Sequence, residues 1–415
     1  MYVMPLNEAV KIISTYSADT FGVCSALFEL GGMVVIHDPS GCNSTYTTHD
    51  EPRWYDTDSL IFISGLTEMD AIMGNDDKII HDVVTAAKDL SPAFIVLLCT
   101  PVPLMMGTDF PALARVIADE TGIPTFAAPT NSMQTYDVGV SWALDLLAKE
   151  FVVSKEESLK QNCCSWQPGI ATNRLHKKFT APPEPLGVNL LGVTPLDFAT
   201  NGSAESLTQF LMDRGFRRVS TWAMGSTLKQ IESAAQADVN LVVSYGGLAA
   251  AKTLQERFGQ PYVVGVPVGD FMANGIAEAL KTAAETKENA YPCSKRPLGA
   301  FTDIAIVGES VYAESLGWAL EDKWKRDVRV FCPLETTPEI LASGDGQVRG
   351  EETLARALSP FRTIIADPLY RPICPKGARF IPLGHEAFSG RLYEKEIPNL
   401  IRDFTAFAET YQEEV

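Results

Sequence analysis

Short apolar runs alternate with helix-length segments along the whole chain, and many of the runs end in Gly, Pro, Ser or Asp. This alternation is typical of βαβ units, in which helices connect parallel strands. In the first third of the chain, the pattern predicts strands over residues 33–37, 60–64, 93–98 and 123–128. Helices are predicted over residues 77–90, 110–121 and 135–151.

The rhythm breaks over residues 152–186, which include the run Ala181-Pro182-Pro183-Glu184-Pro185, and again over residues 290–297. Such stretches are typical of linkers. We therefore predict an α/β fold of three Rossmann-like αβα domains with mostly parallel sheets, covering residues 1–165, 186–295 and 298–395. A C-terminal helix over residues 396–415 is expected to pack back on the first domain.

Charge and hydropathy limit the partners of the chain. Its 415 residues include 34 Lys and Arg and 52 Asp and Glu, which give a formal net charge of −18. Because binding to phosphate backbones depends on clustered cations, a nucleic-acid ligand is not expected. No apolar run approaches the roughly 20 residues of a membrane-spanning helix. Without an export signal at residues 1–10, the expected compartment is the cytoplasm.

Several common catalytic motifs are absent from the sequence. There is no G-x-x-x-x-G-K-[ST] loop and no G-x-G-x-x-G between a strand and a helix, so ATP or dinucleotide binding by these routes is not expected. There is no G-x-S-x-G elbow either. The five histidines show no zinc-binding spacing; they are His37, His49, His81, His176 and His385.

Three cysteines of the first domain are predicted in turns beside apolar elements: Cys24, Cys42 and Cys99. The carboxyl ends of neighbouring parallel strands open into one crevice, where distant thiols can converge. Thiolates suit iron-sulfur clusters or zinc, and Gly41 beside Cys42 would let the backbone approach such a group. Cysteine is also among the most buried residue types, so spacing alone leaves a packing role open.

Four stretches of the first domain resemble the nitrogenase component 1 family, which includes the nitrogenase molybdenum-iron protein subunits and dark-operative protochlorophyllide reductase. They are Asp38-Pro39-Ser40-Gly41-Cys42, Leu66-Thr67-Glu68-Met69-Asp70 leading into Gly74-Asn75-Asp76-Asp77-Lys78, Cys99-Thr100-Pro101 with Gly107-Thr108-Asp109, and the order of the three cysteines. A fifth, Asn240-Leu241-Val242-Val243-Ser244-Tyr245, lies in the second domain. The resemblance implies three αβα domains and a cluster at a subunit interface, held by Cys24, Cys42 and Cys99.

Two positions in the later domains bear on the chemistry. Where the family's nitrogenase α subunits place the cysteine that holds the active-site metal cofactor, this chain has Ser244, a poor substitute for a thiolate. Nitrogen fixation by this subunit alone is therefore not expected. His385 lies near the part of the family that lines the substrate cavity, and it is the predicted catalytic residue; the alternative is an exposed turn histidine. The other five cysteines are interpreted as structural: Cys163, Cys164, Cys293, Cys332 and Cys374.

Three thiolates leave a [4Fe-4S] cluster one ligand short, to be supplied by a carboxylate, a water or a residue across an interface. Alternatively, a second copy or a sister subunit would complete the six thiolates of the family's eight-iron P-cluster. Both arrangements require a homologous partner, in a dimer or heterotetramer, and the resemblance implies an ATP-hydrolysing iron protein as electron donor. The predicted function is electron relay in a nitrogenase-like reductase. The alternatives are a cofactor-maturation scaffold and a cluster-free small-molecule binding protein.

Overall fold

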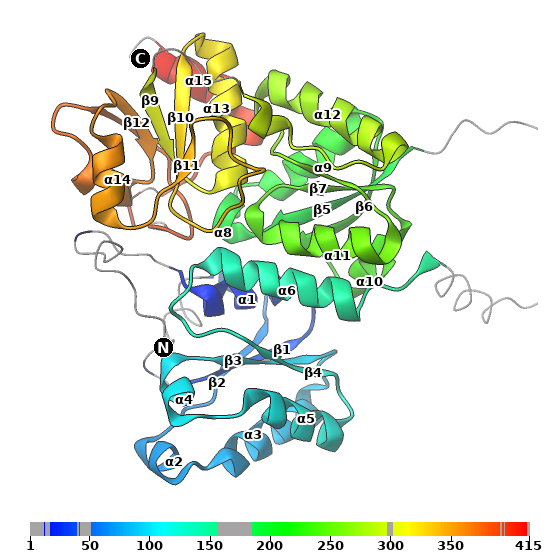
Figure 1. The fold of residues 1–415 in the computed structure, drawn as a ribbon. Coiled ribbons are helices and arrows are strands. Elements are labelled where there is room, and N and C mark those ends of the chain that lie inside the picture. The colour runs from blue at the N-terminus through cyan, green and yellow to red at the C-terminus, as the bar shows by residue number, and fades with distance from the viewer. Residues whose placement is uncertain are drawn as a thin grey trace, which may run out of the picture.

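A computed structural model describes residues 12, 17–39, 41, 51–155, 185–296, 302–390, 392–393 and 395–412. Within them the chain forms three sheets, one in each predicted domain range, and every strand pair is parallel (Figure 1). The predicted α/β class with Rossmann-like domains is therefore confirmed. None of the helices in these residues is both long and apolar enough to cross a membrane.

The first domain has a sheet of strand order β2-β1-β3-β4. Its strands are β1 (Met33–His37), β2 (Leu60–Ile63), β3 (Ile95–Cys99) and β4 (Thr125–Ala128). Its helices are α1 (Asp19–Leu27), α2 (Glu68–Met73), α3 (Asp76–Leu90), α4 (Pro101–Met106), α5 (Phe110–Thr121) and α6 (Tyr136–Glu150). Helices α1 and α6 pack on one face of this sheet, and α3 and α5 cover the other.

The second domain has the strand order β6-β5-β7-β8. Its strands are β5 (Gly187–Val193), β6 (Arg217–Ala223), β7 (Val239–Val242) and β8 (Tyr262–Val264). Its helices are α8 (Pro195–Phe198), α9 (Ser203–Asp213), α10 (Leu228–Glu232), α11 (Leu248–Phe258) and α12 (Gly269–Thr286). Strand β5 is buried along its whole length, as expected for a central parallel strand covered on both faces.

The third domain has the strand order β11-β10-β9-β12-β13. Its strands are β9 (Thr302–Val307), β10 (Asp327–Cys332), β11 (Gly346–Gln347), β12 (Thr363–Ala366) and β13 (Arg379–Pro382). Its helices are α13 (Ser310–Trp324) and α14 (Glu351–Leu358), and α15 (Leu400–Gln412) follows. Helix α15 packs on α9, α12 and α13 of the second and third domains. The expectation that the C-terminal helix returns to the first domain is therefore wrong. The helix instead packs on the second and third domains, and its apolar side chains Leu400, Phe404 and Ala408 are buried.

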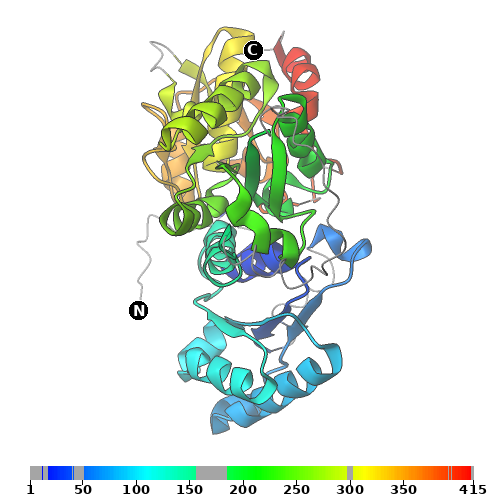
Figure 2. The ribbon, with the colours of Figure 1, turned by 90° about the vertical axis from the view of Figure 1, so that its right-hand side faces the viewer.

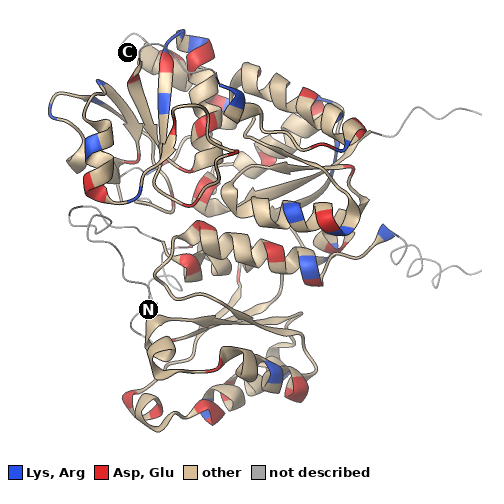
Figure 3. Cartoon of the chain, viewed as in Figure 1, with Lys and Arg blue, Asp and Glu red and all other residues tan. Residues whose placement is uncertain are grey.

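Helix α6 joins the first domain to the rest of the molecule. It packs on α1 on one side, and on α11 and the 3-10 turn Tyr245–Gly247 of the second domain on another. In Figure 2 the α1–α6 pair lies between the first sheet and the two upper domains. Acidic side chains occur on all three domains, in agreement with the net charge of −18 (Figure 3).

The crossing of α1 and α6 depends on two glycines. A Cβ added at Gly22 would lie 1.9 Å from the carbonyl oxygen of Tyr136, and one at Gly139 would lie 1.8 Å from that of Asp19. Any other residue would place a carbon inside the van der Waals radius of a backbone atom, which cannot rotate away. The two helix backbones therefore touch at these points.

Candidate functional site

Cys99 is the last residue of β3 and lies at the carboxyl edge of the first sheet. Its residue surface is 5% exposed. Burial raises the pKa of the thiol to about 11, and the nearby carboxylate of Asp19 adds to this shift. A metal would lower the pKa of a bound thiol by stabilising the thiolate, so the site favours the neutral thiol only while no metal is bound.

Buried polar side chains connect the strand ends around Cys99. Thr100 donates from Oγ1 to Asp38 Oδ1 at 2.6 Å, which links the end of β3 to the turn after β1. His37 Nδ1 lies 2.7 Å from Ser64 Oγ, which links β1 to the end of β2. These contacts hold three strand ends together in a region that the sequence predicts to carry a cluster.

Cys24 lies within helix α1, and the predicted turn at this position is wrong. Gly22, which suggests a turn in the sequence, instead permits the close crossing with α6. The thiol of Cys24 is fully buried in the core between α1, α6 and one face of the sheet. Cys99 belongs to the separate core on the opposite face, with Leu97 and Phe110.

The structure therefore does not bring Cys24 and Cys99 together, although the predicted site requires them to meet. Burial raises the pKa of the Cys24 thiol well above its usual value, and the carboxylate of Glu51 adds to this shift. Cys42 lies outside the described residues. Gly41 is exposed, and an added Cβ would meet no atom of a described residue within 4 Å. Among the described residues, no group of three His, Cys, Asp or Glu side chains is arranged to hold a metal ion.

Exposed apolar side chains gather at this same edge of the sheet, on the short helices and loops that follow β2, β3 and β4. The most exposed is Met105, with 86% of its surface accessible. The set comprises Met69, Ile72 and Met73 on α2, Val102, Leu104 and Met105 on α4, and Met133. We call this set the apolar edge. Exposed apolar groups of this kind are typical of protein interfaces.

A second polar centre lies where the carboxyl ends of the second and third sheets face each other; we call it the interdomain centre. Asp197 follows β5, and its Oδ1 accepts a short hydrogen bond from the Tyr136 hydroxyl of α6. His385, which follows β13, has its Nε2 3.7 Å from the same oxygen. The His385 ring stacks on Phe388 with a centroid separation of 4.4 Å. Neither ring nitrogen forms a hydrogen bond with a described residue.

Both sheets reverse their strand order at this centre. The reversal falls between β5 and β7 in the second sheet and between β9 and β12 in the third. Ligands of open α/β sheets bind in the crevice at such switch points. The cavity beside His385 has a volume of about 30 Å³, enough for about one water molecule, and its lining also includes Glu309 and Asp367.

Buried carboxyls connect the domains at the interdomain centre. Glu309 accepts hydrogen bonds from the backbone N–H of Tyr245 at 2.9 Å and of Tyr312 at 2.9 Å. Asp137 on α6 accepts one from the backbone N–H of Glu335 at 3.0 Å. Burial raises the pKa of Asp137 and of Glu309, each to about 7. These carboxyls therefore stay protonated to about neutral pH.

Ser244 occupies the position at which the resemblance places a cofactor thiolate. Its side chain is fully buried, and Oγ donates to the carbonyl oxygen of Gly192 at 2.8 Å. A serine hydroxyl is a poor substitute for a thiolate ligand, and this one is already engaged by a backbone carbonyl in the core. The residues at the interdomain centre therefore do not fit a cofactor held through position 244.

The raised pKa of Asp137 predicts a specific dependence of stability on pH. The unfolded chain releases this proton near pH 4, whereas the folded protein retains it to about pH 7. Between these values the folded state binds more protons, so stability falls as pH rises. The unfolding free energy of the wild type should therefore decrease between pH 5 and pH 8. In Asp137→Asn we expect this decrease to be smaller by about 2 kcal/mol.

Chemical denaturation at pH 5, 6.5 and 8 measures this effect. Asp119→Asn, at an exposed position of α5, is the matched control and should follow the wild-type dependence. An Asp137→Asn protein whose stability falls with pH as steeply as the wild type would contradict the burial argument.

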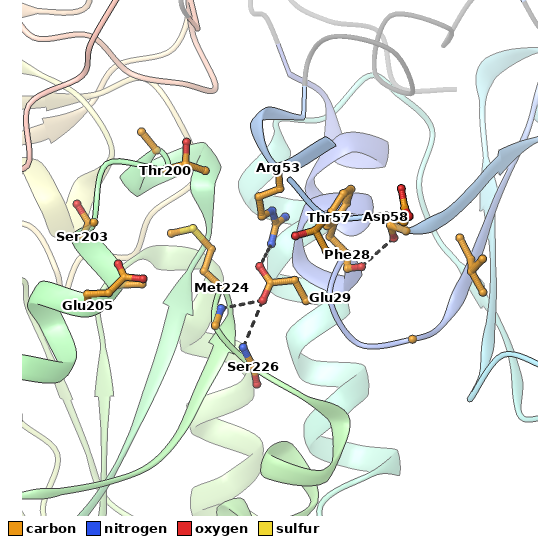
Figure 4. A pocket seen from close by; sticks show the side chains of 17 residues that line it. Phe28, Glu29, Arg53, Thr57, Asp58, Thr200, Ser203, Glu205, Met224 and Ser226 are labelled. Atoms are coloured by element: carbon orange, nitrogen blue, oxygen red, sulfur yellow. Dashed lines mark hydrogen bonds and ion pairs between the residues drawn. The ribbon is translucent and has the colours of Figure 1, made fainter. Parts of the chain in front are cut away.

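A cavity with a volume of about 690 Å³ lies between the first and second domains. Glu29 lies on its wall, where it pairs with Arg53 at 2.9 Å and accepts from the backbone N–H of Gly225 at 2.8 Å (Figure 4). None of the described residues that line it is a cysteine. The cavity is therefore separate from the edge that carries Cys99.

The carboxyls of the interdomain centre do not appear in the predicted site. These carboxyls lie far apart in the sequence, so no short motif contains two of them. They are Asp137, Asp197, Glu309 and Asp367. Their positions after predicted strands could have identified two of them, since Glu309 and Asp367 closely follow β9 and β12 and ligands bind at the carboxyl ends of parallel strands.

The chain is similar in sequence to known proteins. The nitrogenase molybdenum-iron protein alpha chain of Azospirillum brasilense is 23% identical over 273 residues, which cover 62% of this chain and 51% of that protein. A light-independent protochlorophyllide reductase component of Leptolyngbya boryana is 34% identical over 91 residues, 22% of this chain and 18% of that protein. The matches thus span about half the length of the first relative and less of the second.

Solved structures show the same fold. A structure of nitrogenase Cp1 at pH 5 superposes with a TM-score of 0.62 at 15% identity and covers 97% of this chain and 88% of that chain. Residues 19–298 match the family described as nitrogenase component 1 type oxidoreductase. The chain therefore belongs to the nitrogenase component 1 type oxidoreductase family.

Proposed function

We propose that this chain is the iron-sulfur subunit of a nitrogenase-like two-component reductase. It relays single low-potential electrons from an ATP-hydrolysing iron protein to a reducible substrate. Family membership supports an oxidoreductase role. The observation that carries the proposed electron-relay role is the placement of Cys99. This nearly buried thiol lies at the carboxyl edge of a parallel sheet and beside an exposed apolar surface.

Cys99 and Cys42, each of which follows a strand in the sequence, are the proposed cluster ligands. At Gly41, the residue before Cys42, an added Cβ would meet no atom of a described residue, which supports a close approach of the backbone to a cluster. When bound, a [4Fe-4S] or eight-iron cluster supplies one-electron transfer. The protein would contribute thiolates, burial and hydrogen bonds that set its potential. The resemblance also implies Cys24 as a third ligand, but Cys24 packs in the core on the opposite face of the sheet, so our proposal does not include it among the ligands.

The apolar edge supports a homologous component 1 subunit as partner, either a second copy or a sister chain. Its seven apolar side chains lie around the strand end that carries Cys99. Covering them would remove apolar area from water and would also shield a cluster from solvent. Ligands missing from this chain would then come from the partner.

His385 is the proposed catalytic residue at the interdomain centre. Its ring nitrogens form no hydrogen bonds with described residues, and it lies beside Asp197 in a crevice at two switch points. An imidazole so placed can hydrogen-bond a substrate or give it a proton, which reduction requires along with electrons.

A turnover experiment tests the proposal against its closest alternative, a maturation scaffold. The protein is purified without oxygen and incubated with an iron protein, ATP and a reductant. A reductase is expected to consume electrons catalytically, over many turnovers per chain. Consumption of no more than one stoichiometric set of electrons per chain would instead favour the scaffold.

The second candidate function is a cluster-free small-molecule binding protein. The 690 Å³ cavity between the first and second domains favours it, because its volume lies in the range of small-molecule sites. Anaerobic iron and sulfide analysis separates the two functions, since the binding protein would contain neither.

A further inference from the structure

The hydroxyl of Thr130 continues the pairing of β3 beyond the end of β4. The backbone ladder between these strands ends at Leu98 and Ala128. Cys99 is the next residue of β3. Thr130 Oγ1 accepts from the backbone N–H of Cys99 at 3.0 Å and donates to the carbonyl oxygen of Cys99 at 2.9 Å. A single side chain thus replaces both hydrogen bonds that a neighbouring strand would provide. Thr130 is 5% exposed, so little water competes for these bonds.

Thr100 fixes the same segment from the β1 side. Cys99 is paired with His37 in the β1–β3 ladder. The hydroxyl of Thr100, which is fully buried, lies 2.6 Å from Asp38 Oδ1 and 3.0 Å from the carbonyl oxygen of His37. The backbone around Cys99 is therefore held by side-chain hydroxyls on both sides, at the point where regular strand pairing stops.

The backbone of a residue at the end of a strand is usually free to move, and its side chain moves with it. A metal ligand has to be held within about 0.5 Å of its working position by surrounding hydrogen bonds. We propose that Thr130 and Thr100 are positioning residues that hold the Cys99 thiolate in place as a cluster ligand. This inference rests on the proposed function for the role of Cys99, but the hydrogen bonds do not depend on it.

Four variants test the inference. Thr130→Val keeps the shape of the side chain and removes both hydrogen bonds to Cys99, whereas Thr130→Ser keeps the hydroxyl. Thr100→Val removes the link to Asp38. Thr208→Val is the matched control, because the Thr208 hydroxyl donates only to Ala204 within α9. Iron retention against a chelator and the electron paramagnetic resonance spectrum are measured on anaerobic protein. The rate of Cys99 alkylation is measured on iron-free protein by peptide mass spectrometry.

We expect Thr130→Val to retain iron roughly tenfold less tightly and to change the resonance spectrum, since such changes beside metal ligands typically cost 10–100-fold in affinity. Thr100→Val should act in the same direction, and Thr130→Ser and Thr208→Val should match the wild type. Cys99 should be alkylated faster in Thr130→Val than in Thr130→Ser.

Wild-type iron retention, spectrum and alkylation rate in both valine variants would overturn the inference and leave the proposed function standing. A wild-type protein without iron would overturn the proposed function, and the alkylation rates would still decide whether the hydroxyls position Cys99. If Thr130→Val has a lower melting temperature than the wild type, Thr100→Val and Thr130→Ser decide between a positioning role and a purely structural role. A lowered melting temperature with an unchanged spectrum would show the structural role alone.

Discussion

Replacing Cys99 by alanine is expected to remove most of the iron from the anaerobically purified protein. The proposed cluster loses a thiolate, and the nearby Asp19 carboxylate cannot replace it, because it is already engaged by the backbone N–H groups of Asn131 and Ser132. We expect iron content to fall by more than about tenfold, the lower range for changes around metal ligands. Electron transfer from the iron protein should fall in parallel.

Cys24→Ala is the matched comparison for this variant. Since Cys24 is buried in the core beside α6, the variant should lose about 1–2 kcal/mol of stability, a small truncation in a packed core, and keep most of its iron. Cys42→Ala should lose iron as Cys99→Ala does. Equal loss from all three variants would restore the three-cysteine site as predicted from the sequence. Full iron content in Cys99→Ala would contradict the role assigned to Cys99.

Substituting alanine for Gly22 is expected to destabilise the whole molecule. The new methyl group would lie 1.9 Å from the carbonyl oxygen of Tyr136, and only a shift of α1 or α6 could relieve the overlap. Overpacking commonly costs 1–3 kcal/mol, and a contact with backbone belongs at the upper end, about 3 kcal/mol or more. Because α6 also connects to the second domain, docking of the first domain should weaken too. Chemical denaturation with tryptophan fluorescence measures both effects.

Gly275→Ala provides the control for Gly22→Ala. Gly275 is an exposed residue within α12, and an added Cβ meets no atom within 4 Å in the described part of the chain. There the alanine should stabilise the protein by about 0.5–1 kcal/mol through helix propensity and reduced freedom of the unfolded chain. Equal stabilities for the two variants would show that α1 and α6 do not cross as closely as described.

The architecture could be predicted because parallel strands buried on both faces form short, continuous apolar runs. The predicted helix over residues 110–121 and the predicted strand over residues 33–37 have the same bounds in the structure. Helix α1 was not predicted, because eight of its nine residues are buried and it has no polar stripe to reveal a helical period. Its glycine, which suggested a turn, serves the crossing instead.

The candidate site could be predicted only in part. Cys99 follows an obvious strand, so its position at the carboxyl edge could be inferred from sequence alone. The side of the sheet on which Cys24 packs depends on how α1 crosses α6, which is a tertiary contact between residues more than 100 positions apart. The interdomain centre likewise assembles Tyr136, Asp197 and His385 from three domains. Only the folded arrangement brings these side chains together.

The most direct measurement is the iron and acid-labile sulfide content of the full-length protein purified without oxygen, recorded together with its electron paramagnetic resonance spectrum. Electron relay through Cys99 predicts stoichiometric iron and sulfide and a signal that the Cys99→Ala protein lacks. A colourless protein that contains neither iron nor sulfide, with or without a co-expressed homologous subunit, would contradict it.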